Sequence, residues 1–287
     1  MVSLLNHQQA AHRLLTEIFN VSSILETDLS RKILDWFLRF DLTSGILSGS
    51  ETLAKREWYT AISEYYTIEA ERHPEIHEFK ILKGIFRHRV TCKDLGDLFA
   101  KISRDEVSRE VFRAQCQFHA QEIISWKRSL DPIFRDEKYQ VRNPQDSMDS
   151  KDKDAVGPFI PAILYRGQLT ALNYMCADYL AIQLILEYKK HLILGEPLPE
   201  EVPSLTRDLC GIFEAIDSPF MPPEAILKTQ GVLGLASLFL PKDKRHIQWV
   251  GPSSQSLSLI STDLIISLRL ISSNAVTLTL GHFIAFA

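Results

Sequence analysis

Apolar residues recur at helical spacing through most of the first 240 positions, and the alternation typical of strands is nearly absent there. This pattern predicts an all-α protein, an irregular bundle of several helices. The first two predicted helices are amphipathic. Their inward faces are expected to be Leu4, Ala11, Leu15 and Ile18 in the first and Leu29, Ile33, Trp36, Phe37 and Phe40 in the second.

A third helix is predicted from about Glu51 to Arg72, and a fourth begins after Pro74. The third is expected to turn inward Ala54, Trp58, Ala61, Ile62, Tyr65 and Ile68. The sequence Ser103-Arg-Asp-Glu106 has the form of a capping box, in which a serine hydroxyl accepts a backbone N–H bond at a helix start and a glutamate accepts another in return. We expect it to open a long helix that ends near Asp131.

Helical periodicity stops over residues 135–158, where charges of both signs are mixed with turn-forming residues. This stretch is predicted to be a mobile charged loop, where a protease should cut first. The pattern resumes from Pro161 to Leu194, which we interpret as the central buried helix. It is not expected to span a membrane, because polar residues interrupt it at regular intervals. Gly195 is expected to end this helix, and two shorter helices are predicted over Thr206–Asp217 and Glu224–Leu240.

Composition changes abruptly after Trp249. Residues 251–287 carry only two charged side chains, Asp263 and Arg269, among Ser, Leu, Ile and Thr. We therefore divide the chain into a helical domain of residues 1–250 and an atypical tail of residues 251–287. The tail is interpreted as read-through of an intron or a shifted reading frame.

Charge and cysteine content narrow the class of protein. The formal net charge of -4 gives no long-range attraction to a polyanion such as nucleic acid. The first residues lack the basic and continuous apolar regions of a secretory signal, which predicts an intracellular protein. The cysteines lack the close spacing of a metal knuckle, and reduced core thiols are expected at Cys92, Cys116, Cys176 and Cys210.

The histidines do not favour a metal or catalytic site. His73 and His77 are four positions apart, but Pro74 places His73 at a helix cap, off the regular helical face. The glutamate between them is also displaced from its place in the metalloprotease signature. His88, between Arg87 and Arg89, is interpreted as part of a solvated basic spot.

Glycine and carboxylate patterns favour structure over chemistry as well. No strand precedes the segment from Gly45 to Gly49, as a nucleophile elbow would require. Gly231-Val-Leu-Gly234 lacks the third glycine of a dinucleotide-binding turn and is interpreted as a close approach of helices. Asp94 and Asp97 are expected on a solvated helix face. The sequence therefore predicts no catalytic, cofactor-binding or metal-ligating residues, and no enzyme.

One segment carries a resemblance to a known family. Residues 33–41, ILDWFLRFD, are continued by Gly45, Gly49 and then residues 51–58, ETLAKREW. This order resembles the fungal-specific transcription factor domain, in which a helix ending in Trp...Arg-Phe-Asp is followed by a glycine-bearing turn and a helix that begins near Arg-Glu-Trp. The resemblance covers roughly residues 1–250, and its later parts are residues 164–173, residues 234–241 and Arg245-His246.

The residues of this segment are expected to have structural roles. Trp36 and Trp58 are assigned to apolar faces. Arg39 and Asp41 are expected to flank a helix end and to fix the turn by a salt bridge or a cap. Arg56 is expected to reach either Asp41 or Glu57.

The resemblance implies a regulator of transcription in the nucleus, whose helical domain lies downstream of a binuclear zinc cluster. Protein partners in transcription complexes are expected, with homo- or heterodimerisation among the modes of association, and no membrane. DNA would be bound only through the zinc-cluster module. That module needs six cysteines in two short runs, which this sequence lacks. We therefore expect either that the protein extends upstream or that it is a truncated relative.

Two other readings remain open. One is a helical-bundle protein that binds or converts a small molecule in a pocket among Tyr165, Arg166, Tyr174 and Asp178. The other is a dimerising decoy that pairs with a full-length factor and blocks it.

The 287-residue chain should show no sequence-specific affinity for DNA, because its net charge is negative and it contains no recognition module. Fluorescence anisotropy with labelled duplexes measures this directly. Nanomolar binding to one duplex that persists at raised salt would contradict the prediction.

Overall fold

The computed structural model describes residues 2–128, 135–141 and 162–216, together with scattered positions from Met221 to Trp249. The predicted all-α class is confirmed, since these residues form a multi-helix bundle with one short antiparallel sheet. The elements in chain order are α1 (Val2–Ile18), η1 (Ser23–Leu25), α2 (Asp28–Ser48), α3 (Arg56–Arg72), α4 (His77–Ser103), α5 (Arg109–Arg128), η3 (Glu137–Tyr139), β1 (Gln140–Val141), β2 (Leu164–Tyr165), η6 (Gly167–Leu169), α6 (Ala171–Leu194) and α7 (Val202–Ile216).

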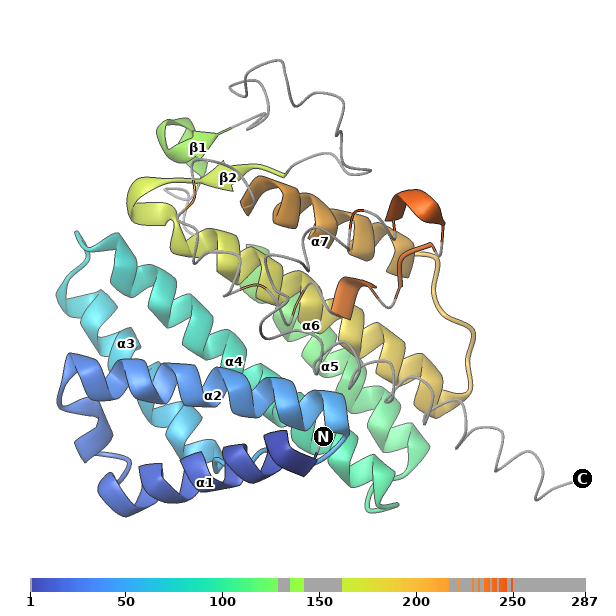
Figure 1. Cartoon of the computed structure of the whole chain (residues 1–287), viewed down its shortest axis with the longest axis horizontal. Coiled ribbons are helices and arrows are strands. Elements are labelled where there is room, and N and C mark those ends of the chain that lie inside the picture. Colours follow the sequence, from blue (N-terminus) through green and yellow to red (C-terminus); the bar gives the residue numbers. More distant parts are fainter. Residues whose placement is uncertain are drawn as a thin grey trace, which may run out of the picture.

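The long helix α4 lies at the centre of the bundle. It contacts α2, α3, α5 and α6, and Figure 1 shows α1, α2 and α3 grouped on one side of it, with α6 and α7 on the other. Its C-terminal half is buried on almost every side, through Cys92, Lys93, Leu95, Gly96, Leu98, Phe99, Ala100 and Ile102. A helix that is buried all round forms the core of a domain.

The helix α6 is the second core element. The segment Gly167–Leu194 is apolar and long enough to cross a membrane, but 56% of its most apolar window is buried inside the bundle. It packs against α4, α5 and α7, which is the arrangement of a core helix. The predicted helix began ten residues too early: Leu164–Tyr165 pairs with Gln140–Val141 as a strand, and a short 3-10 turn follows before α6 starts at Ala171.

Local sequence signals set several helix ends. Thr27 caps α2 through a capping box, because its hydroxyl accepts from the Ser30 backbone N–H at 3.1 Å while the Ser30 hydroxyl accepts from that of Thr27 at 3.3 Å. Gly49 ends α2 and Gly195 ends α6, each with a positive φ near 70° that favours glycine. The predicted stop at Gly195 is confirmed.

The predicted capping box at residues 103–106 is wrong. The helix α4 runs through Ser103, whose hydroxyl donates to the Phe99 carbonyl at 2.8 Å within the last turn. The side chain of Glu106 is bound instead by Arg104, at 2.6 Å. Ser108 stands before α5 and accepts from the Val111 N–H at 3.3 Å. Ile102, directly before the motif, is buried, so the apolar face of α4 reaches its last turn, and Ser103 belongs to that turn.

The predicted inward face of α2 is also wrong in part. Phe37 is buried, but Leu29, Ile33 and Trp36 are exposed, and the buried positions of this helix include Leu34, Phe37, Leu38 and Leu42. Two overlapping apolar faces exist on α2, so spacing alone does not select between them. In α1 Ile18 is exposed, and in α3 Ile68 is exposed.

Three predicted boundaries also move. The helix α3 starts at Arg56 and not at Glu51, and α7 starts at Val202 and not at Thr206. The predicted mobile loop was expected from Arg135, but residues 135–141 contain η3 and β1. Residues 142–158, most of the predicted helix Glu224–Leu240 and the tail 251–287 lie outside the described residues.

The prediction of reduced core thiols is confirmed for Cys92, Cys116 and Cys210, whereas Cys176 is a free thiol outside the fully buried core. All four cysteines are free thiols; Cys92, Cys116 and Cys210 are buried and Cys176 is half-buried. Burial raises the pKa of Cys116 and of Cys210 to about 12 each, so these thiols stay protonated at neutral pH.

Replacing Phe99 by alanine should lower the free energy of unfolding by about 3–5 kcal/mol, because its ring is buried against Phe112 at a centroid distance of 6.1 Å and truncation leaves a cavity. Phe118 of α5 is 60% exposed. Phe118→Ala should therefore change stability by less than about 0.5 kcal/mol. Urea denaturation of both variants measures the difference, and equal losses would contradict the assignment of α4 to the core.

Candidate functional site

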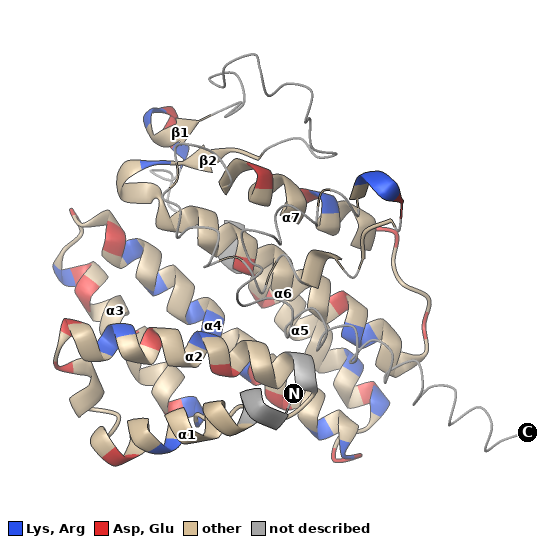
Figure 2. Cartoon of the chain, in the orientation of Figure 1, with Lys and Arg blue, Asp and Glu red and all other residues tan. Residues whose placement is uncertain are grey.

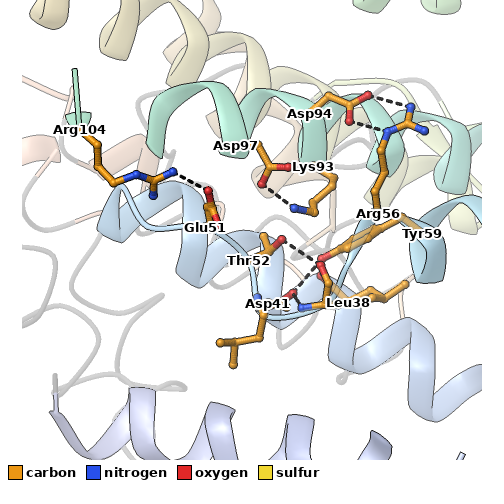
Figure 3. A network of polar contacts seen from close by, with 12 residues as sticks. Leu38, Asp41, Glu51, Thr52, Arg56, Tyr59, Lys93, Asp94, Asp97 and Arg104 are labelled. Atoms are coloured by element: carbon orange, nitrogen blue, oxygen red, sulfur yellow. Dashed lines mark hydrogen bonds and ion pairs between the residues drawn. The ribbon is translucent and has the colours of Figure 1, made fainter. Parts of the chain in front are cut away.

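A buried carboxylate organises the junction of α1, α2 and α3. Asp41 of α2 is fully buried. Its Oδ1 atom accepts hydrogen bonds from the Gln8 side-chain amide at 2.7 Å and from the Leu53 backbone N–H at 2.8 Å. Its Oδ2 atom accepts from the Ala54 N–H at 2.9 Å and from the Tyr59 hydroxyl at 3.0 Å (Figure 3). Both oxygens only accept, which fits an ionised carboxylate that four donors stabilise in place of water.

Tyr59 shows the electrostatic effect of this carboxylate. Its ring is fully buried in α3. Burial, together with the neighbouring negative charge of Asp41, raises the pKa of the Tyr59 hydroxyl far above its usual value. The hydroxyl therefore serves as a permanent donor at neutral pH and does not act as a base.

Ion pairs from α4 surround the turn that Asp41 holds. Arg56 binds Asp94 through two bonds of 2.7 and 3.0 Å, which joins the start of α3 to α4. Arg104, at the end of α4, reaches Glu51 at 2.6 Å (Figure 3). The turn between α2 and α3 is thus fixed from inside by Asp41 and from outside by α4.

A further ion pair on α4 is largely buried. Lys93 pairs with Asp97 one turn away, and the lysine side chain is only 6% exposed (Figure 3). Asp94 and Asp97 were expected on a solvated face. Both are instead half-buried and paired with cations, because α4 is covered along this side by its neighbours.

Two more pairs connect α2 to the rest of the core. Arg39 reaches Asp178 of α6 at 3.3 Å, and Arg89 of α4 pairs with Asp35. Arg39 and Asp41 both lie inside α2, so the expectation that they flank a helix end is wrong. The expected partners of Arg56, Asp41 or Glu57, are also wrong, since its partner is Asp94. The first error arises because α2 continues to Ser48, so that Asp41 lies inside the helix. The second arises because both oxygens of Asp41 already accept bonds from other donors, while Asp94 of α4 binds Arg56 with both of its oxygens.

A histidine and a cysteine form a second buried polar pair, on α4. His88 is 5% exposed and its Nε2 atom lies 3.5 Å from the Cys92 sulfur. The prediction that His88 is solvated is therefore wrong. Burial lowers the pKa of His88 to about 4 and raises the pKa of the Cys92 thiol. At neutral pH both groups are uncharged, which is the opposite of the thiolate and imidazolium found in cysteine nucleophiles.

A hollow of about 240 Å³ opens between α4 and α5, next to this pair. Its lining combines a cation, an anion, neutral polar groups and an exposed aromatic ring, from Arg87, His88, Thr91, Phe118, Gln121, Glu122, Ile123 and Ser125. A second hollow of about 440 Å³ lies along the turn between α4 and α5 and reaches Ile193. Their size suits small ligands or ordered water.

The pocket considered from sequence does not correspond to these hollows. Neither of them is lined by Tyr165, Arg166, Tyr174 or Asp178. Asp178 binds Arg39, whereas the Arg166 guanidinium donates to the Lys138 carbonyl at 3.2 Å. In the β2 region Asn173 holds the Tyr165 backbone through bonds of 2.8 Å to its N–H and to its carbonyl. These positions shape the turn into α6.

The remaining sequence candidates are dispersed. His73 caps the end of α3 and His77 opens α4. Among the residues that the structure describes, no group of three His, Cys, Asp or Glu side chains is placed to hold a metal ion. Gly45 and Ser48 lie within α2, and Gly231 and Gly234 fall outside the described residues.

Sequence reasoning did not find two members of the Asp41 network. Tyr59 lies three positions before Ile62, which is predicted to face inward and is buried. Helical spacing therefore places Tyr59 on the same inward face. Gln8 carries no such signal, because a polar residue on α1 is expected in solvent and becomes buried only by meeting Asp41 of another helix.

Comparison of the sequence with models of known protein families gave no match, and neither did searches among curated proteins and solved structures.

Replacing Asp41 by asparagine should lower the free energy of unfolding by about 2–4 kcal/mol. The amide NH₂ of asparagine is a donor, so it would face two of the four surrounding donors and leave them without an acceptor. Tyr59→Phe removes one of the four donors and should lose only about 1 kcal/mol. Asp208→Asn, at an exposed site on α7, serves as the control and should have little effect. Chemical denaturation ranks the three variants, and an Asp41 variant as stable as the control would refute the central role of this carboxylate.

Proposed function

We propose that the chain is a helical regulatory domain of the fungal zinc-cluster transcription factor type, which acts in the nucleus through protein partners and is neither an enzyme nor, by itself, a DNA-binding protein. One observation carries this proposal. Within the segment of residues 33–58 that resembles that family, Asp41 and Arg56 fix the turn between α2 and α3, and Trp58 of the same segment is buried.

This arrangement supports a regulator because Asp41 and Arg56 both have structural roles. Asp41 is surrounded by donors, and Arg56 is engaged with both oxygens of Asp94. A family signature made of such residues specifies a scaffold, and the function of a scaffold lies in the surfaces that it presents. The neutral state of His88 and Cys92 also weighs against nucleophilic catalysis by this pair.

A second candidate function, sensing of a small effector, is favoured by the hollow between α4 and α5. Arg87 and Glu122 supply opposite charges there and Phe118 supplies an aromatic surface. Such a lining suits a small molecule that has both polar and apolar parts. Effector binding at this place would be compatible with a regulatory domain, because α4 also carries the ion pairs that hold the turn between α2 and α3.

Fusing the complete chain to an unrelated sequence-specific DNA-binding domain tests the proposal in a yeast reporter strain. The fusion should change reporter expression several-fold relative to the DNA-binding domain alone, since the chain would bring or block protein partners at the promoter. The Asp41→Asn fusion should show a weaker effect, because destabilisation lowers the amount of folded protein, and the Asp208→Asn fusion should keep the full effect. Reporter expression that equals that of the DNA-binding domain alone, with the fusion present at normal levels, would reject the proposal.

A further inference from the structure

The helix α2 presents an apolar stripe to solvent. Leu29 is 70% exposed, Ile33 42% and Trp36 65%. The ring of Phe40 stacks on that of Trp36, with centroids 6.0 Å apart and planes within 4° of parallel. These four residues are separated by four, three and four positions, which places them in one row along the helix. Scattered apolar residues are normal on a surface, but a continuous row of this kind is not.

The neighbouring helix α1 extends this stripe into a broader surface. The two helices are antiparallel, since Gln8 bonds to Asp41 while the ring of His12 lies 5.8 Å from that of Phe37 (Figure 1). Leu14 and Ile18 of α1 are 58% and 67% exposed.

The exposed residues of the two helices lie on the same side of the pair. Trp36 immediately precedes Phe37, which meets α1, and Leu14 immediately precedes the buried Leu15. Two antiparallel helices are related by a two-fold axis perpendicular to their common plane. On each helix, the residue one position before a residue that faces the other helix therefore points to the same side of that plane. We call this surface the α1–α2 face, defined by Leu14, Ile18, Leu29, Ile33, Trp36 and Phe40.

The size of the α1–α2 face is near that of a protein interface. Phe40 is half-buried, and from the exposed fractions of the other five residues the face presents roughly 600 Å² of apolar surface, at the upper end for a monomeric protein. A stable interface buries about 800 Å² on each partner, of which the apolar centre is the major part. The nearby charges are already paired within the chain, Arg13 with Glu17 and Asp28 with Lys32. Figure 2 shows charged residues of both signs along α1 and α2, and because these pairs are satisfied within the chain, the partner need not supply an opposite charge.

We propose that the α1–α2 face binds a second copy of this chain, with the two α2 helices antiparallel around a two-fold axis. The spacing of four, three and four is the same in both directions along the helix, as a two-fold interface requires. Reversing α2 about the midpoint of the stripe places Ile33 opposite Trp36 and Leu29 opposite Phe40 of the second copy. Each aliphatic side chain then meets an aromatic ring, so that large and small groups alternate across the interface.

The helix α1 fits the same axis. Gln8 is level with Asp41 and His12 with Phe37, so the midpoint of the stripe on α2 is level with Leu14 and Leu15 on α1. The axis therefore passes close to Leu14, which lies near its counterpart in the second copy. This inference goes beyond the proposed function and does not depend on it, because it concerns the association of the chain with itself.

Paired substitutions test this geometry through the mass of the complete chain in solution. Light scattering after size exclusion, at micromolar concentration, should give a dimer of twice the 32.8 kDa chain mass. Ile33→Lys and Trp36→Glu should each give monomers, because every homodimer would bury two like charges without partners. Mixing the two variants should restore the dimer, since the axis places the lysine of one copy opposite the glutamate of the other while the second pair stays apolar.

Controls keep the outcomes distinct. Phe118→Gln alters an aromatic residue of similar exposure on α5 and should leave the dimer intact. Circular dichroism of each variant should match the parent chain, because the substituted side chains are exposed. A parent chain that stays monomeric overturns the proposal. In that case, removing residues 251–287 would test whether they cover the α1–α2 face, and either result leaves the proposal overturned. Dimers that survive both substitutions, or a mixture that remains monomeric, overturn it as well.

Discussion

The buried carboxylate of Asp41 is the constraint on which the N-terminal half of this protein depends. A charge without water around it must be stabilised by donors, and here they come from α1, from the turn after α2 and from α3. This requirement rotates α2 so that Asp41 points inward, and the rotation determines which of the two apolar faces of α2 is buried. One polar side chain thus sets the packing of apolar ones.

The helix α4 transmits this constraint to the rest of the bundle. Arg56 pairs with Asp94 of α4 and Arg104 pairs with Glu51, so both sides of the turn are tied to α4, while Arg89 of α4 pairs with Asp35 nearer the start of α2. Each exposed ion pair contributes little to the free energy of unfolding. Several pairs that join one helix to its neighbours nevertheless help to fix the position of that helix. The junction is therefore held from several sides, by hydrogen bonds to Asp41 and by ion pairs to α4.

Orientation of α2 by Asp41 has a consequence at the surface. Burying Leu34, Phe37 and Leu38 leaves Leu29, Ile33 and Trp36 in water, where they cost free energy until something covers them. The protein thus retains apolar surface outside its core, in an ordered row on a helix whose position is fixed. A rigid surface of this kind is suited to association because little entropy is lost when it binds.

The sequence by itself determined the all-α class, the end of a helix at Gly195, the burial of Cys92, Cys116 and Cys210, and the general extent of α4 and α6. These features follow from periodicity and from turn chemistry, which act between residues that are close along the chain. Only the tertiary structure decided which face of α2 is buried, that Arg56 pairs with Asp94, that His88 is buried and that residues 103–106 do not open a helix. Each of these depends on residues far apart in the sequence, such as Gln8 and Asp41 or Arg39 and Asp178. Local spacing contains no information about which distant residue a polar side chain will bind. On a helix with two apolar faces, such as α2, that distant partner determines which of the two faces is buried.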